Sequence, residues 1–224
     1  MPGVTPLELP GIGTRKNEKS PLRVYDYVDD LRRLYLAEKY QGPKGLLGIS
    51  FGGMIAQSWL SQYQSDFLFA ALINTSAKIL SPAYKRLTPK ALSTLCRTTC
   101  SINKEKRIKT ILQGTTNLIK IDPPLITKWL EYENEYPTSS LSFIRQLFAA
   151  YNFSPVKSIK TPIAIFLSAQ DSFVSPQCSK QLAEFYQAPL FIHKTAGHDL
   201  PLDDPQWLLN ALRESYDTIP KTHG

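Results

Sequence analysis

Residues 45–56 read Gly45-Leu46-Leu47-Gly48-Ile49-Ser50-Phe51-Gly52-Gly53-Met54-Ile55-Ala56 and form the most informative stretch of the chain. A short apolar run, a Gly-x-Ser-x-Gly motif and a second apolar run predict a strand, a tight corner and a helix. A serine at such a corner stands clear of both elements, where its hydroxyl can attack a carbonyl carbon. The flanking Gly48 and Gly52 fit a corner with little room for a Cβ atom. The alternative is a glycine-rich connection in which Ser50 only caps the helix.

The composition is that of a globular protein with one domain, or with one domain and an inserted lobe. The chain has 224 residues, of which 42% are hydrophobic and 20% are charged. No run approaches the roughly 18 apolar residues of a membrane span, and no signal segment opens the chain. Three cysteines do not make a disulfide framework, and Cys96 and Cys100 lack further ligands for zinc. We expect these two to be buried thiols, no metal site, and a cytoplasmic location.

Alternating strand and helix patterns on either side of a helical block predict an α/β fold with a mostly parallel sheet of about five strands. The expected strands are residues 4–9, 44–49, 67–73, 162–167 and 190–193. The expected helices around them are a helix that begins at Ser20-Pro21, and residues 51–63, 176–186 and 205–216. The core therefore comprises residues 1–76 and 156–224.

The helical block over residues 77–155 reads as an insertion, or cap, with helices at residues 82–98, 104–113, 124–135 and 139–151. Its segment from Ala77 to Lys128 is strongly basic, with only Glu105 and Asp122 as acids. The basic residues there are Lys78, Lys85, Arg86, Lys90, Arg97, Lys104, Lys106, Arg107, Lys109, Lys120 and Lys128. One interpretation is a solvated helical surface; the other is a dock for an acidic partner or anionic substrate. No nucleic-acid module is visible, so we expect no nucleic acid partner.

Residues that could activate Ser50 should follow the carboxyl ends of the strands, where sites of open α/β sheets lie. Asp171 follows the strand at 162–167, and His198 follows the strand at 190–193. A neutral imidazole can take the serine proton, and a buried carboxylate can orient the imidazole. Asp171 could instead only make an Asx turn. Asn74, at the end of the strand at 67–73, carries no charge and is a poor substitute.

The other histidines and nearby aspartates are weaker candidates for activating Ser50. His193 falls within a strand, and His223 lies in the C-terminal tail. Asp199 and Asp203 are close to His198 in sequence, and Asp204 reads as a helix cap. The backbone N–H of Phe51, at a helix N-terminus, would face the negative charge that develops on the attacked carbonyl.

With these residues, the chain resembles the α/β-hydrolase superfamily over nearly its whole length. The matching stretches are residues 7–13, 48–53, 171–176 and 196–201. The resemblance implies a serine hydrolase of the carboxylesterase or lipase type that works through an acyl-enzyme, without metal or cofactor. A narrower resemblance is to the pimeloyl-acyl-carrier-protein methyl ester esterases, for which a basic cap would suit an acidic carrier protein.

The sequence departs from this family at its beginning. A member normally has about three further strands before the Leu-Pro-Gly-x-Gly turn, and one ends in a His-Gly loop that supplies the second oxyanion donor. The strands at 4–9 and 44–49 must then pair directly or keep free edges, through which a second copy could associate. We expect a truncated hydrolase, a short member with reduced activity, or a non-catalytic relative.

The expected reaction is hydrolysis of a carboxylic ester or thioester by Ser50, His198 and Asp171. Aromatic residues of the cap are candidates for the acyl pocket, although they could equally form the core of the cap: Trp129, Phe143, Phe148 and Tyr151. The alternative function is a catalytically impaired or non-catalytic relative that binds a small ligand or an acidic carrier protein.

Overall fold

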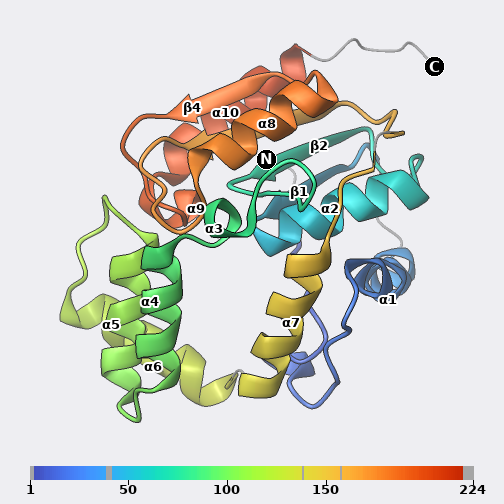
Figure 1. Cartoon of the computed structure of the whole chain (residues 1–224). Coiled ribbons are helices and arrows are strands. Elements are labelled where there is room, and N and C mark those ends of the chain that lie inside the picture. Colours follow the sequence, from blue (N-terminus) through green and yellow to red (C-terminus); the bar gives the residue numbers. More distant parts are fainter. Residues whose placement is uncertain (1–2, 39–41, 138, 157, 219–224) are drawn as a thin grey trace.

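A parallel sheet forms the centre of the computed structural model, which describes residues 3–38, 42–137, 139–156 and 158–218 (Figure 1). Its strands lie in the order β1-β2-β3-β4 and alternate with helices along the chain, which confirms the predicted α/β class. Their bounds are β1 (Gly45–Ile49), β2 (Phe69–Ile73), β3 (Ile163–Ser168) and β4 (Leu190–His193). The register aligns Gly48 with Leu72, Leu72 with Ile165, and Ile165 with Leu190.

Helices cover both faces of this sheet, and β2 shows why its sequence is an unbroken apolar run. Ala70 and Leu72 belong to a buried cluster with residues of α1 (Val24–Ala37), α2 (Phe51–Gln62) and α8 (Pro176–Tyr186). The alternate residues of β2 point to the opposite face, where they pack with α9 (Leu200–Asp203) and α10 (Pro205–Asp217). Since both faces of β2 are buried, apolar side chains are needed at every position.

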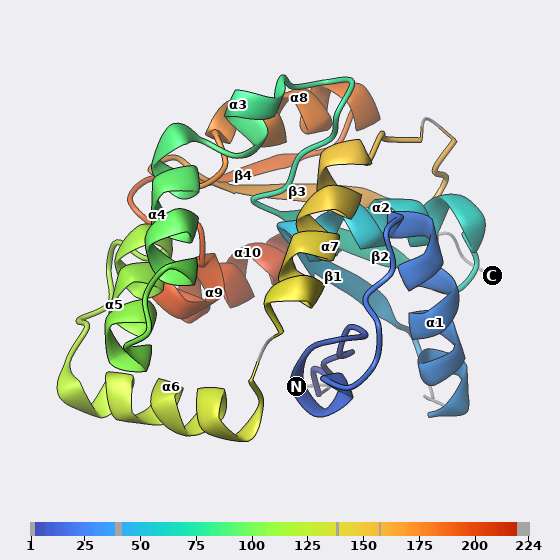
Figure 2. The ribbon, with the colours of Figure 1, turned by 60° about the horizontal axis from the view of Figure 1, so that its bottom comes forward.

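The segment between β2 and β3 is helical, as predicted, and its helices stand beyond the carboxyl ends of the strands (Figures 1 and 2). They are α3 (Ala83–Arg86), α4 (Pro89–Thr99), α5 (Lys104–Thr115), α6 (Pro123–Glu135) and α7 (Ser140–Asn152). We refer to these helices as the cap. In both views α7 lies across from α4 and α5.

One predicted cap helix is divided into two. The helix expected at residues 82–98 is interrupted between α3 and α4, where Thr88 has an extended backbone. The hydroxyl of Thr88 accepts the backbone N–H of Ala91 at 3.1 Å and so caps α4. Pro89 follows and has no N–H to continue the helical ladder.

The strand predicted at residues 4–9 is absent, and the described part of the chain contains four strands rather than about five. Pro6 and Pro10 lack the N–H that a ladder requires, and Val4 is 86% exposed. Within the described residues, β1 pairs with β2 alone, so its other edge is free. Association of two copies through this edge stays a prediction.

Two smaller expectations were also wrong. Ser20 does not cap α1: the helix begins at Val24, and the Ser20 hydroxyl donates to the carbonyl of Pro10 at 2.7 Å. Cys96 lies on α4 and Cys100 directly follows it, and both are exposed rather than buried. Among the described residues, no helix is both long and apolar enough to cross a bilayer.

Candidate active site

Ser50 occupies the corner between β1 and α2 in a strained backbone conformation. Its φ of 51° and ψ of −114° are unusual for a residue with a side chain, and such conformations cost on the order of 1–3 kcal/mol. Hydrogen bonds hold the corner: the Ser50 N–H donates to the carbonyl of Ile73 at 2.9 Å. The Ser50 carbonyl accepts the Thr75 hydroxyl at 2.6 Å. No side-chain capping hydrogen bond from Ser50 to α2 is present, which argues against the simple capping role.

The three glycines around Ser50 differ in how much space the corner leaves for a Cβ atom. A Cβ atom on Gly48 would lie 2.8 Å from the Cα of Gly53 and would overlap the carbonyl oxygen of Gly52. A Cβ atom on Gly53 would lie 2.6 Å from the Cβ of Thr75. At Gly52, in contrast, an added Cβ meets nothing within 4 Å. The expectation of crowding therefore holds for Gly48 and is wrong for Gly52.

Asp171 and His198 come from different strand ends and form a direct contact. The His198 Nδ1 lies 2.7 Å from Oδ2 of Asp171, and the two residues are 8% and 7% exposed. The other carboxylate oxygen, Oδ1, accepts the N–H groups of Phe173 and Val174 at 2.7 and 3.0 Å. Asp171 therefore makes the Asx-type turn and orients His198 at the same time.

Asn74 anchors the backbone of His198, a role that sequence reasoning missed. Its Nδ2 donates to the His198 carbonyl at 2.8 Å, and its Oδ1 accepts the N–H of Ser168 at 2.8 Å. Asn74 has a φ of 45°, and asparagine tolerates this left-handed conformation better than most residues. An asparagine directly after a buried strand was the available signal, but its partners are more than ninety residues away.

Asp203 also holds the loop that carries His198, without touching the imidazole. Its carboxylate accepts the backbone N–H groups of Gly197 at 2.6 Å and of Asn117 and Leu118 at 2.9 Å. It thus joins the His198 loop to the segment after α5. No local pattern in the sequence predicts these long-range contacts of Asp203.

The other expected structural roles are confirmed. His193 lies within β4, where its Nδ1 accepts the N–H of Ala196 at 2.9 Å. Its Nε2 lies 3.2 Å from Asp204, whose carboxylate also caps α10 by accepting the Trp207 N–H at 2.9 Å. His223 lies outside the described residues.

Ser50 lines a cavity of about 600 Å³ between the sheet and the cap. Phe51, the first residue of α2, lines it as well, and its N–H has no acceptor within the helix. Three of the four predicted acyl-pocket residues also line this cavity, all on α7: Phe143, Phe148 and Tyr151. Trp129 is not one of the residues that line it, and lies half-buried on α6.

The same cavity is connected to His198 by direct contacts. Asn74, which binds the His198 carbonyl, is one of the lining residues. Phe173 is another, and its ring lies 5.1 Å from the imidazole of His198, measured between centroids. The cavity, Ser50 and the His198–Asp171 pair therefore share one end of the sheet.

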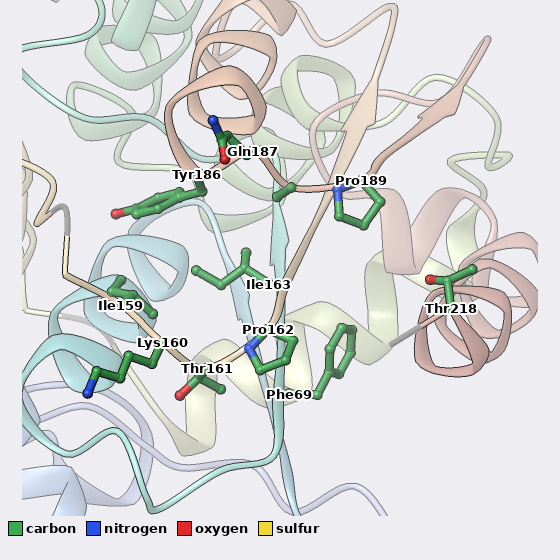
Figure 3. A pocket seen from close by; sticks show the side chains of 11 residues that line it. Phe69, Ile159, Lys160, Thr161, Pro162, Ile163, Tyr186, Gln187, Pro189 and Thr218 are labelled. Carbon is green, nitrogen blue, oxygen red and sulfur yellow. The ribbon is translucent and has the colours of Figure 1, made fainter. Parts of the chain in front are cut away.

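A second cavity, of about 260 Å³, lies at the opposite end of the strands (Figure 3). It is lined by residues at the amino ends of β2 and β3, including Phe69, Pro162 and Ile163, and by Tyr186 and Thr218. Among the described residues that line it, there is no histidine, cysteine or carboxylate. It has no group suited to proton transfer near neutral pH, so the Ser50 cavity is the candidate active site.

The basic residues of the cap do not form one uniform surface. Arg86 is only 8% exposed. Arg107 pairs with Glu133, and Lys109 pairs with Glu105 at 2.7 Å. Docking of an acidic carrier protein on the remaining exposed lysines stays a prediction.

Comparison with known proteins identifies a family whose model matches most of the chain. The family model described as "Serine aminopeptidase, S33" matches residues 8–204. A search of curated protein sequences found no significant match.

Solved structures of hydrolases share the fold. An esterase from Exiguobacterium antarcticum has a TM-score of 0.73 at 16% identity, covering 94% of this chain and 80% of that one. A thermophilic esterase from Thermogutta terrifontis has a TM-score of 0.69 at 18% identity, with 94% and 78% covered. A hydrolase from Pseudomonas aeruginosa PA01 has a TM-score of 0.72 at 16% identity, with 93% and 77% covered. At such identities the likeness concerns the fold alone.

Proposed function

Because the chain belongs to the serine aminopeptidase S33 family of the α/β-hydrolase superfamily, we propose that this hydrolase cleaves a carboxylic ester or thioester with Ser50, His198 and Asp171. The observation that carries the proposal is the 2.7 Å contact between His198 and Asp171. This contact lies at the end of the sheet where Ser50 lines the cavity.

The proposed reaction begins with attack of Ser50 Oγ on the carbonyl carbon. When Nδ1–H of His198 donates to Asp171, the lone pair of the neutral imidazole is on Nε2, which accepts the serine proton. The tetrahedral oxyanion receives the N–H of Phe51 and the partial positive charge of the N-terminus of α2. Collapse expels the alcohol or thiol, to which His198 returns the proton, and leaves an acyl-enzyme.

Water completes the cycle. His198 takes a proton from water, whose oxygen attacks the acyl carbon, and the second tetrahedral intermediate releases the carboxylic acid and restores Ser50. The carboxylate of Asp171 stabilises the imidazolium that forms in each half-reaction.

Ester cleavage fits the cavity better than removal of an N-terminal residue from a peptide. An aminopeptidase must accommodate the positively charged amino group of its substrate, which a carboxylate would favour. No aspartate or glutamate lines the described cavity, whereas Arg86 does. The polar groups of the site therefore favour a neutral or anionic ester.

Turnover of p-nitrophenyl esters and of acyl thioesters tests this proposal. The wild-type protein should hydrolyse them, Ser50→Ala should not, and Ser65→Ala, an exposed serine in the loop between α2 and β2, serves as the matched control. The alternative, a non-catalytic relative, predicts that ligands raise the Tm without turnover. Equal rates for wild-type protein and Ser50→Ala would refute the proposed role of Ser50.

A further inference from the structure

Arg86 places a buried positive charge in the wall of the cavity that contains Ser50. The residue ends the short helix α3, is 8% exposed, and lines the cavity. Most of the other lining side chains are apolar. A guanidinium keeps its charge in proteins, so its burial has to be compensated by partners.

Neutral groups are the only hydrogen-bond partners of Arg86 within the described residues. Nε lies 3.4 Å from the hydroxyl of Ser76, Nη1 donates to the carbonyl of Tyr151 at 2.9 Å, and Nη2 donates to the carbonyl of Ala150. No carboxylate forms an ion pair with it there. Of the five N–H groups of a guanidinium, these bonds use three.

The two carbonyl groups that bind Arg86 compensate part of its buried positive charge. Ala150 and Tyr151 lie in the last turn of α7, whose C-terminal end carries about half a negative charge. The rest of the charge has no counterpart among the described side chains, and burial accordingly lowers the pKa of Arg86 from its ordinary value. A bound anion would supply that counterpart.

The guanidinium is connected to the Ser50 corner by two adjacent residues. Thr75 donates its hydroxyl to the carbonyl of Ser50 at 2.6 Å, and the next residue, Ser76, contacts Nε of Arg86. The loop after β2 thus places the serine and the cation around one cavity. Between them, an aliphatic segment of a substrate would contact the apolar wall contributed by α7.

We propose that Arg86 binds the free carboxylate of an anionic ester, so that the substrates are half-esters of aliphatic dicarboxylic acids. This inference rests on the proposed ester hydrolysis and adds the class of substrate. The two N–H groups of Arg86 that its protein partners leave over are the donors to the carboxylate. A single carboxylate would balance the part of the positive charge of Arg86 that its carbonyl partners leave uncompensated.

The selectivity between monomethyl suberate and dimethyl suberate tests the assignment, because the two esters share the chain and differ in charge. Wild-type protein should have a higher kcat/KM for the half-ester. Hydrogen bonds to charged groups are worth about 1.5–3 kcal/mol, so Arg86→Gln should lower the ratio of the two kcat/KM values by roughly 10- to 100-fold. Arg86→Lys, which keeps a charge but loses the planar fork, should lower it less.

Arg97→Gln is the matched control, since Arg97 is an exposed residue of α4 that does not line the cavity. Its selectivity ratio should equal that of the wild-type protein. If Arg86 only caps α7, Arg86→Gln will lower the Tm and leave the ratio unchanged, which would overturn the proposal. A wild-type preference for the diester would overturn it as well, and this measurement requires no variant.

A failure of the proposed ester hydrolysis can be distinguished from a failure of the proposed role of Arg86. If neither ester is hydrolysed by wild-type protein, the assignment of Ser50 fails, whereas binding to Arg86 is still measured by calorimetry with monomethyl suberate. The half-ester should then bind wild-type protein and Arg97→Gln at least tenfold more tightly than dimethyl suberate does. Equal binding of the two esters would refute the role of Arg86.

Discussion

The Nδ1 atom of His198 lies 2.7 Å from Oδ2 of Asp171, while Oδ1 of the same carboxylate accepts the N–H groups of Phe173 and Val174. The loop that follows β3 therefore holds one carboxylate oxygen, and the other contacts His198 in the loop that follows β4. A carboxylate fixed in this way selects the imidazole tautomer that carries its proton on Nδ1.

Asp171→Asn should reduce kcat by roughly 10⁴-fold. The amide oxygen can still accept the two backbone N–H groups, but the amide nitrogen would donate to Nδ1 of His198 and place the ring proton on Nε2. The imidazole could then no longer accept the proton of Ser50. Steady-state kinetics with a p-nitrophenyl ester measures the effect, and Asp217→Asn, on the surface of α10, is the control. A variant with undiminished kcat would show that Asp171 only forms the turn.

Gly48→Ala and Gly52→Ala form a matched pair at the Ser50 corner. At Gly48 the added Cβ collides with backbone atoms, and we expect a loss of about 1–3 kcal/mol in the free energy of unfolding. At Gly52 the space is open and the residue is helical, so alanine should stabilise the protein by roughly 0.5–1 kcal/mol. Urea denaturation compares the two variants. Equal losses would contradict the geometry of the corner.

The sequence was sufficient to predict the positions of the candidate catalytic residues because these depend on local patterns. An apolar strand ends before Asp171 and another ends before His198, and all strands of a parallel sheet present their carboxyl ends at one edge. The bounds of α8 and β4 were also predicted correctly, and Pro176 suits the first position of a helix.

Long-range contacts account for what the sequence did not reveal. The sequence showed Arg86 only as one of the basic residues of the cap, because nothing near it in sequence indicates that the end of α7 binds it. The anchoring roles of Asn74 and Asp203 depend in the same way on distant backbone groups. The apolar pattern of residues 4–9 predicted a strand, but Pro6 lacks the N–H group that a strand ladder requires.

Asp204 should contribute to stability in a pH-dependent manner. The N–H of Trp207 and then the imidazole of His193 hold the pKa of Asp204 below its ordinary value. A carboxylate of this kind stabilises the folded protein above its unfolded-state pKa, near 3.9, and this contribution is lost as the pH falls through the lower folded-state value.

Asp204→Asn separates this charge effect from capping, because asparagine caps helices about as well as aspartate. Its free energy of unfolding should fall less steeply than that of the wild-type protein as the pH is lowered below about 4. Urea unfolding at a series of pH values measures both slopes, with Asp217→Asn for comparison. Identical slopes for Asp204→Asn and wild-type protein would show that the ionisation of Asp204 does not contribute to the stability of the fold.

Covalent labelling by a fluorophosphonate, mapped by mass spectrometry of peptides, tests the central claim most directly. Such probes react with a serine whose hydroxyl is activated by a neighbouring base. We predict that the folded wild-type protein is labelled at Ser50 and that His198→Ala, folded to the same extent, is labelled far more slowly. Labelling of other residues only, or equal labelling of Ser50 with and without His198, would contradict the account.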